Sequence, residues 1–529
     1  MTRKILFLTA VTIILIPVLT GSATPAPVNT YSVDAKLDGL EDFIERGMSD
    51  WGIPGMGVSI VKDDEIVYAE GFGVKKLGEN DPVDEHTLFG IASVTKGMVS
   101  TAMGILVEEG KLGWNDRVRD HLEWFELSDQ WVSDNVTIRD LLSHQVGIGR
   151  MTGNRIIFMP HRDPRTIMEH IKHQPFEATF RSRSVYSNVM YMVAGMIIEE
   201  ASGMSWDLFL EERVLRPTGM TRSNASFTKL QGSSNVAWPH QEIEGRVQTI
   251  PRRSFDNVGP AGAVNASAYE AAKWMKLNLG DAGEYKGERI IDERIINQVL
   301  QPQQARSLRD PYRDQLTSYA LGWGLNHYEG YRTVQHSGAI DGMNTTLVLV
   351  PELELGIFIT ANLFNNFRSA FVNHVMDIFM GIEREIDWHE YYYERHLKSK
   401  EAALERRNEV DNSRVPDTRP SLPLEEYTGS YFDKVYDDLE VKIGSDGNLE
   451  LHFWGDGESI ADLEHWHFDT FRATWRNPAM REKFVTFDLD QYGKVKRLNV
   501  NFTLRPSVLQ AGIYPANYFR IVSYEKGGR

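Results

Sequence analysis

A serine followed three residues later by a lysine occurs four times in this chain of 529 residues, beginning at Ser59, Ser93, Ser226 and Ser523. A serine hydroxyl is a poor nucleophile until an adjacent base takes its proton. A lysine amine can be that base, because burial and neighbouring positive charge lower the pKa of an ammonium group. Such a pair therefore predicts acyl transfer by a serine nucleophile wherever both side chains meet in one site.

Local sequence patterns separate the four pairs. Ser59 and Lys62 lie in "GVSIVKDDEIVYAEGFG", which predicts two strands joined at a pair of aspartates, and residues three apart in a strand point to opposite faces. The third pair lies in a loop-like stretch, and the fourth lies at the chain end. Apolar residues recur at helical spacing after Ser93, so we expect Lys96 one turn later on the same face. The alternative is a serine that only caps a helix, followed by an exposed lysine.

The elements that carry this pair fall into two units. Strand-forming sequences enclose a helix-rich middle, which is typical of an α+β domain whose sheet is assembled from both ends of the segment. A charged, helix-prone segment and a linker, "DNSRVPDTRPSLP", follow. Period-2 alternation in "DLEVKI", "NLELHF", "KFVTFDLD" and "KVKRLNVNF" then predicts a small all-β barrel or sandwich. We expect a first domain over residues 24–383, a helix and linker over 384–422, and a β domain over 423–529.

Composition and the N-terminal sequence limit the partners. A net charge of −17 argues against binding to nucleic acid and to anionic membranes. Arg3 and Lys4 precede the apolar run "ILFLTAVTIILIPVLT", which predicts a signal peptide over residues 1–23, a periplasmic or secreted protein and no membrane span after its removal. The absence of cysteine excludes a thiol nucleophile and cysteine-ligated metals.

Two further motifs accompany Ser93 and Lys96. The sequence "YSN" at 186–188 reads Tyr-x-Asn, and "HSG" stands at 336–338. Together and in this order, the three motifs resemble those of class C β-lactamases, penicillin-binding proteins and related serine hydrolases. Connecting segments such as "IRDLLSHQVGI", "GPAGAVNASAYEAAKWM" and "YALGWGL" extend the resemblance over about residues 33–365. It implies an antiparallel sheet flanked by helices, with an added helical lobe.

The resemblance implies a role for each matching residue. Ser93 would attack a carbonyl carbon and form an acyl-enzyme, while Lys96 and Tyr186 would move its proton to the leaving group, in an order that the sequence leaves open. The backbone N–H groups of Ser93 and of the residue after the third motif would form the oxyanion hole. The implied substrate-binding residues are Asn188, His336, Gly338 and Ala339. No metal or other cofactor is implied.

One residue departs from the pattern of the lactamases. His336 stands where those enzymes carry a lysine, and a histidine is largely neutral at pH 7. This favours a peptidase or amidase on short peptides, including peptides with D-residues, over a β-lactamase. The alternatives are a carboxylesterase or weak β-lactamase of the same fold, and a catalytically silent binding or regulatory protein.

A basic segment precedes the second motif. Residues 150–183 contain seven arginines and lysines but only three acids, in a chain that is acidic overall. We expect Arg181 or Arg183 to bind a substrate carboxylate in place of the missing lysine. The alternative is a solvated loop.

The C-terminal sequence carries a second resemblance. "LEEYTGSYFDKVYDDLEVKIGSDGNLELHF" is similar to the lipocalin-like domain that is appended to some of these hydrolases. The resemblance implies a barrel that covers the active site or builds a homo-oligomer, with no cofactor inside it.

Overall fold

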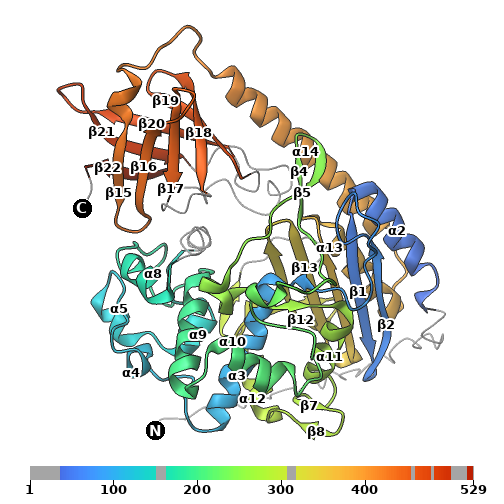
Figure 1. The fold of residues 1–529 in the computed structure, drawn as a ribbon. Coiled ribbons are helices and arrows are strands. Elements are labelled where there is room, and N and C mark those ends of the chain that lie inside the picture. Colours follow the sequence, from blue (N-terminus) through green and yellow to red (C-terminus); the bar gives the residue numbers. More distant parts are fainter. Residues whose placement is uncertain are drawn as a thin grey trace, which may run out of the picture.

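The computed structural model describes residues 36–149, 162–306, 317–453, 459–477, 482–501 and 521–527 (Figure 1). The expected signal peptide and the basic residues Arg150 and Arg155 lie outside these ranges. Within them, no helix has both the length and the apolar character needed to span a membrane.

An antiparallel sheet of eight strands forms the centre of the first domain. The strand order is β2-β1-β14-β13-β12-β11-β10-β9. The strands are β1 (Gly55–Lys62), β2 (Glu65–Gly73), β9 (Gln304–Arg306), β10 (Thr317–Tyr319), β11 (Gly324–Tyr328), β12 (Tyr331–Ile340), β13 (Met343–Val350) and β14 (Leu355–Ala361). The predicted N-terminal hairpin is confirmed, and its two turn residues, Asp63 and Asp64, have φ of 52° and 59°, as a tight two-residue turn requires.

Strands from both ends of the domain meet in this sheet. Strand β1 pairs with β14, and Val58 lies opposite Ile359. The expected sheet assembled from both ends is therefore confirmed.

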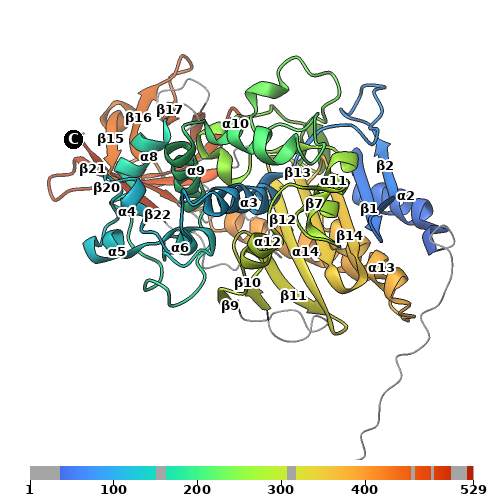
Figure 2. The same cartoon turned by 90° about the horizontal axis from the view of Figure 1, so that it is seen from below.

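Helices cover both faces of the sheet (Figure 2). On one face, Ile357 and Ile359 pack into a cluster with α2 (Leu40–Trp51) and α13 (Phe367–Met380). On the other face, Phe358 packs into a cluster with α3 (Thr95–Glu108), α9 (Asn188–Ser202), α11 (Ala268–Asn278) and α12 (Glu293–Val299). Alternate residues of a strand point to opposite faces, so an apolar strand such as β14 is buried on both sides.

A helical lobe extends the second face. Its helices are α4 (Val118–His121), α5 (Gln130–Asn135), α6 (Ile138–Leu142), α8 (Pro164–Ile171) and α10 (Trp206–Leu210). Small strands complete the domain: β3 (Phe89–Gly90) with β6 (Asn265–Ala266), β4 (His240–Ile243) with β5 (Arg246–Thr249), and β7 (Glu284–Tyr285) with β8 (Glu288–Arg289).

The C-terminal unit is a closed antiparallel barrel of eight strands, reached through the long helix α14 (Trp388–Asn412) (Figure 1). Its strands are β15 (Gly429–Asp433), β16 (Asp437–Ile443), β17 (Leu449–Phe453), β18 (Ile460–His467), β19 (Thr470–Trp475), β20 (Lys483–Leu489), β21 (Val495–Asn501) and β22 (Ile521–Lys526). Alternate residues are buried, as in β16 and β17, so side chains fill the barrel interior. The predicted fold class, an α+β domain of the β-lactamase type followed by a small barrel, is confirmed.

The barrel rests on helix α8. The Arg162 guanidinium lies 2.6 Å from a carboxylate oxygen of Asp437, which is nearly fully buried at the β15–β16 turn. The His170 ring lies 3.1 Å from the Lys434 carbonyl oxygen in the same turn. These contacts tie the barrel to the lobe next to the segment that leads to Tyr186.

Candidate active site

Ser93 lies in a short 3-10 turn (Ala92–Val94) that leads directly into α3. Ala92 has φ of 48°, a strained conformation for a residue with a side chain. The N-cap of α3 is Val94 and not Ser93, so the reading of Ser93 as a helix cap is wrong. The turn therefore presents the Ser93 hydroxyl instead of using it for capping.

Ser93 Oγ contacts the two other members of the expected catalytic group. The distance from Lys96 Nζ to Ser93 Oγ is 3.1 Å, and the distance from Tyr186 Oη to Ser93 Oγ is 2.8 Å. Both lie within the range of hydrogen bonds that a base and an acid need for proton transfer.

Lys96 is fully buried under Ser93. Its amine donates to Asn188 Oδ1 at 2.9 Å and to the Ala261 carbonyl oxygen at 2.6 Å. The rings of Tyr186 and Tyr191 lie 4.9 and 5.1 Å from Nζ. Two carbonyl acceptors and the Ser93 hydroxyl thus lie around the amine. Asn188, expected to orient a substrate amide, binds Lys96 in this structure.

His144 positions the loop that carries Tyr186. It is fully buried and has φ of 62°. Its carbonyl accepts from Val185 N at 2.8 Å, and its Nδ1 accepts from Ser187 N at 3.1 Å. The His144 and Tyr186 rings lie 4.3 Å apart, so the residues on both sides of Tyr186 are bound to this one histidine.

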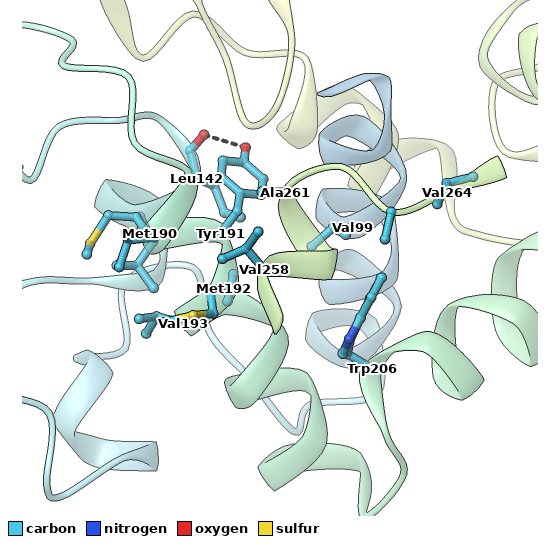
Figure 3. Packing of buried hydrophobic residues seen from close by; sticks show 14 of the residues in the cluster. Val99, Leu142, Met190, Tyr191, Met192, Val193, Trp206, Val258, Ala261 and Val264 are labelled. Atoms are coloured by element: carbon cyan, nitrogen blue, oxygen red, sulfur yellow. Dashed lines mark hydrogen bonds between the residues drawn. The ribbon is translucent and has the colours of Figure 1, made fainter. Parts of the chain in front are cut away.

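Apolar packing holds Leu142, two residues before His144, against α9 and α3 (Figure 3). The Tyr191 hydroxyl donates to the Leu142 carbonyl oxygen at 2.7 Å, drawn as a dashed line in Figure 3. Met192 and Val193 of α9 lie in the same cluster as Val99 of α3. The segment that contains Leu142, helix α9 and helix α3 therefore share one hydrophobic cluster.

Strand β12 brings the third motif against the serine turn. A Cβ atom on Gly338 would lie 2.1 Å from the Ile91 carbonyl oxygen and 3.0 Å from Ser93 N, so only glycine allows this approach. Ala339 follows on the same strand. The backbone amides of Ser93 and Ala339 are the candidate oxyanion donors, as expected from the sequence.

His336 is nearly buried at the edge of this group. Its Nδ1 lies 2.9 Å from the Ser337 carbonyl oxygen, and its Nε2 lies 3.0 Å from the Tyr319 hydroxyl. The carbonyl can only accept, so Nδ1 carries the proton, and a neutral ring then accepts the Tyr319 proton at Nε2. A histidine held by a carbonyl and a tyrosine hydroxyl thus stands at the position where a lysine would supply a permanent charge.

The two arginines expected to bind a carboxylate are placed differently. Arg181 forms a bidentate pair with the buried Asp140, at 2.8 and 2.7 Å, and this pair raises the pKa of Arg181. Asp140 is part of the capping box that begins α6. Arg183 is exposed and donates to the Glu177 carbonyl oxygen at 3.3 Å. The Arg181 guanidinium thus already has a carboxylate partner, and the binding of a substrate carboxylate by either arginine stays a prediction.

Three residues join the site without having been singled out from the sequence. His144, Ala261 and Tyr319 lie in the connecting segments "IRDLLSHQVGI", "GPAGAVNASAYEAAKWM" and "YALGWGL". The segments were recognisable, but the contacts of a ring or a backbone carbonyl cannot be read from residue type. Among the described residues, no cluster of three histidine or acidic side chains could hold a metal ion.

The sequence model of the beta-lactamase family matches residues 40–376. The chain belongs to this family. It is a serine hydrolase of the beta-lactamase and penicillin-binding protein type, and the barrel overlaps a second match, over residues 413–511, to a domain of unknown function.

Similar proteins support this assignment. The chain is 28% identical over 429 residues to an unguisins hydrolase of Aspergillus campestris, covering 77% of this chain and 78% of the other. It is 24% identical over 346 residues to the protein flp of Staphylococcus aureus, covering 64% and 65% of the two chains.

Solved structures share the fold across both units. An octameric penicillin-binding protein homologue from Pyrococcus abyssi matches with a TM-score of 0.59 and 22% identity, covering 88% of this chain and 98% of the other. SurE matches with a TM-score of 0.56 and 19% identity, covering 94% of this chain and all of the other.

Proposed function

We propose that the protein hydrolyses amide bonds of short peptides through an acyl-enzyme on Ser93. The observation that carries the proposal is the contact of Ser93 Oγ with both Lys96 Nζ and Tyr186 Oη. An amine leaves an amide only after it gains a proton, so a phenol beside the nucleophile suits amide cleavage.

Lys96 is the base in this proposal. A neutral amine can donate to Asn188 and Ala261 and direct its lone pair to Ser93 Oγ, so that it takes the proton as the hydroxyl attacks the carbonyl carbon. The Tyr186 phenol gives its proton to the leaving amine and regains one from Lys96. Water then attacks the acyl-enzyme, and the same groups return the proton to Ser93.

The edge of β12 supports a peptide as the substrate. Pairing between β11 and β12 ends at Gln335, so no described strand pairs with the following residues of β12 on that edge. An extended peptide can add to such an edge through backbone hydrogen bonds, with its carbonyl at the oxyanion donors. Peptides that contain D-residues remain within this proposal.

The histidine at position 336 supports a peptidase or amidase over a β-lactamase. An imidazole that contacts Tyr319 and the Ser337 carbonyl does not supply the permanent charge that a lysine ammonium would offer to a substrate carboxylate. The relative named an unguisins hydrolase supports hydrolysis as the general activity. Export to the periplasm or medium, and self-association through the barrel, remain proposals that rest on the sequence.

A serine-directed probe tests the nucleophile. The wild-type protein should react with a fluorophosphonate and gain one adduct on Ser93, while Ser93→Ala should not react. Ser59→Ala is the matched control, since Ser59 begins another Ser-x-x-Lys and its buried hydroxyl has no hydrogen-bond partner in the described structure. Turnover is then compared on peptide anilides, esters and a chromogenic cephalosporin. Faster turnover of the cephalosporin than of any peptide, or no labelling of the wild type, would contradict the proposal.

A further inference from the structure

A pocket adjoins the catalytic turn on the side away from Tyr186. Gly90 of β3, Gly262 and Ile340 all line it. Gly262 directly follows Ala261, whose carbonyl binds Lys96, and a Cβ on Gly262 would lie 3.4 Å from the backbone of Ala92. The pocket therefore adjoins the turn that carries Ser93.

The two ends of strand β12 show on which side of the site this pocket lies. His336 lies near Tyr186, with ring centroids 6.4 Å apart, whereas the pocket is lined by Ile340 and Asp341 at the other end of the strand. Four residues of strand span about 13 Å. Because Tyr186 protonates the leaving group in the proposed reaction, the opposite end receives the acyl part of the substrate.

The pocket wall is mainly apolar. The apolar residues that line it are Phe227, Leu230, Val236, Ala237, Pro239, Phe255, Ala263, Ile340 and Met343. Burial of a hydrocarbon group here gains about 25 cal/mol for each Å² of apolar surface removed from water.

Arg252 is a cation in this wall without an acidic partner. Its guanidinium donates to the carbonyl oxygens of Val236 and Ala237 at 2.9 and 3.0 Å and lies 4.1 Å from the centroid of the Trp238 ring. Its buried Nε has no hydrogen-bond partner, and no acidic side chain of the described residues pairs with it. Burial lowers the pKa of Arg252 to about 10, so it is still charged at neutral pH.

The other charged side chains at the pocket, one arginine and two aspartates, have polar partners of their own. Arg253 forms an ion pair with Asp341. Asp256 accepts hydrogen bonds from the Ser226 hydroxyl at 2.8 Å and from Phe227 N at 2.7 Å, and so holds the loop. Arg252 is therefore the arginine of this lining that has no carboxylate partner among the described residues, and its buried, unsatisfied Nε is a donor that an incoming carboxylate would satisfy.

We propose that this pocket binds the acyl part of the substrate, and that it selects a hydrocarbon group that carries a carboxylate, bound by Arg252. This rests on the proposed function, because the acyl side is defined by Tyr186. The corresponding substrates are peptides or amides whose residue before the scissile bond has an acidic side chain, or whose acyl group is a dicarboxylic acid.

Matched substrates test the selection. Two p-nitroanilides of equal chain length, one from a hydrocarbon acyl chain ending in a carboxylate and one from a chain ending in methyl, are compared with the two corresponding p-nitrophenyl esters. The wild type should prefer the carboxylate in both pairs. In Arg252→Gln, kcat/KM for the carboxylate chain should fall about 30-fold or more, with a change of less than about threefold for the methyl chain. Arg252→Lys, which keeps the charge, should retain part of the preference.

Controls separate the possible failures. Arg294→Gln removes a charge from an exposed side chain and should leave the preference unchanged. Equal losses on both chains in Arg252→Gln, or no preference in the wild type, would overturn the selection by Arg252. The wild-type preference is measured without any variant, so the test survives if Arg252→Gln does not fold. A carboxylate preference on esters without amide turnover would retain the pocket assignment and overturn the peptidase proposal instead.

Discussion

Replacement of Tyr186 by phenylalanine removes one hydroxyl from the centre of the site. The lost contact is the 2.8 Å bond to Ser93 Oγ, whereas the ring can keep its place 4.3 Å from His144 and 4.9 Å from Lys96 Nζ. General acid–base catalysis contributes about 10²- to 10⁴-fold, so kcat/KM for a peptide anilide should fall by this factor. The equivalent rise in the activation barrier is about 3–5 kcal/mol.

The leaving group gives this prediction its sharpest assay. A p-nitrophenolate leaves an ester without being protonated, so Tyr186→Phe should lose less than about tenfold on the matched p-nitrophenyl ester. Assays on the anilide and the ester of the same acyl group measure the loss of kcat/KM for each leaving group. Equal losses on both substrates, or an anilide rate within threefold of the wild type, would refute the role of Tyr186 as the acid.

Tyr191→Phe is the control for loss of a tyrosine hydroxyl in the same core. Its hydroxyl donates to the Leu142 carbonyl oxygen, which also accepts from Gly322 N at 3.3 Å. Removing one of the two donors should lower the free energy of unfolding by about 1 kcal/mol and leave kcat/KM within a few-fold. Tyr186→Phe should show the reverse, with lost activity and an almost unchanged urea midpoint.

Three other perturbations test the surroundings of the site. Gly338→Ala places a Cβ 2.1 Å from the Ile91 carbonyl oxygen, so the turn that carries Ser93 must move away from β12. The value of kcat/KM should then fall about 10²- to 10³-fold, with an unchanged circular dichroism spectrum. Full activity would contradict the close approach of the two segments. Arg181→Ala removes the arginine partner of the buried Asp140 and should lower the free energy of urea unfolding by about 1–3 kcal/mol. Its effect on kcat/KM should be equal for peptides with free and with amidated C-termini. A loss of kcat/KM only on free C-termini would support Arg181 as the anchor of a substrate carboxylate. Burial lowers the pKa of His374, so the unfolded chain binds a proton at this histidine before the folded protein does as the pH falls below about 6.5. The urea midpoint should therefore decrease between pH 7.5 and pH 5.5. The decrease should be smaller in His374→Gln.

The sequence predicted the parts of the site that local periodicity and motif order determine. The hairpin that excluded Ser59, the helical turn that joins Ser93 to Lys96, and the meeting of both with Tyr186 are all present in the structure. These follow from spacing within one element, or from three motifs in a known order.

The remaining contacts depend on segments that only the fold brings together. The carbonyl of Ala261 and the ring of His144 act through position, and any residue type has a carbonyl. Arg181 was predicted from the charge of its segment, but a single buried acid, Asp140, determines where its guanidinium lies. The pocket around Arg252 could not be predicted from the sequence either, because its lining comes from six separate stretches of chain.

The pairing of β1 with β14 has a consequence for how the chain folds. Gly55 N donates to Asn362 Oδ1 across 307 residues of sequence. The N-terminal hairpin therefore cannot pair with β14 until most of the domain has been synthesised. At about 5–20 residues per second, synthesis of that intervening chain takes roughly 15–60 s. Such distant pairing also folds slowly once the chain is complete. The sheet of the nascent protein therefore stays incomplete during most of its synthesis, because β14, which pairs with β1, is the last strand of that sheet to emerge.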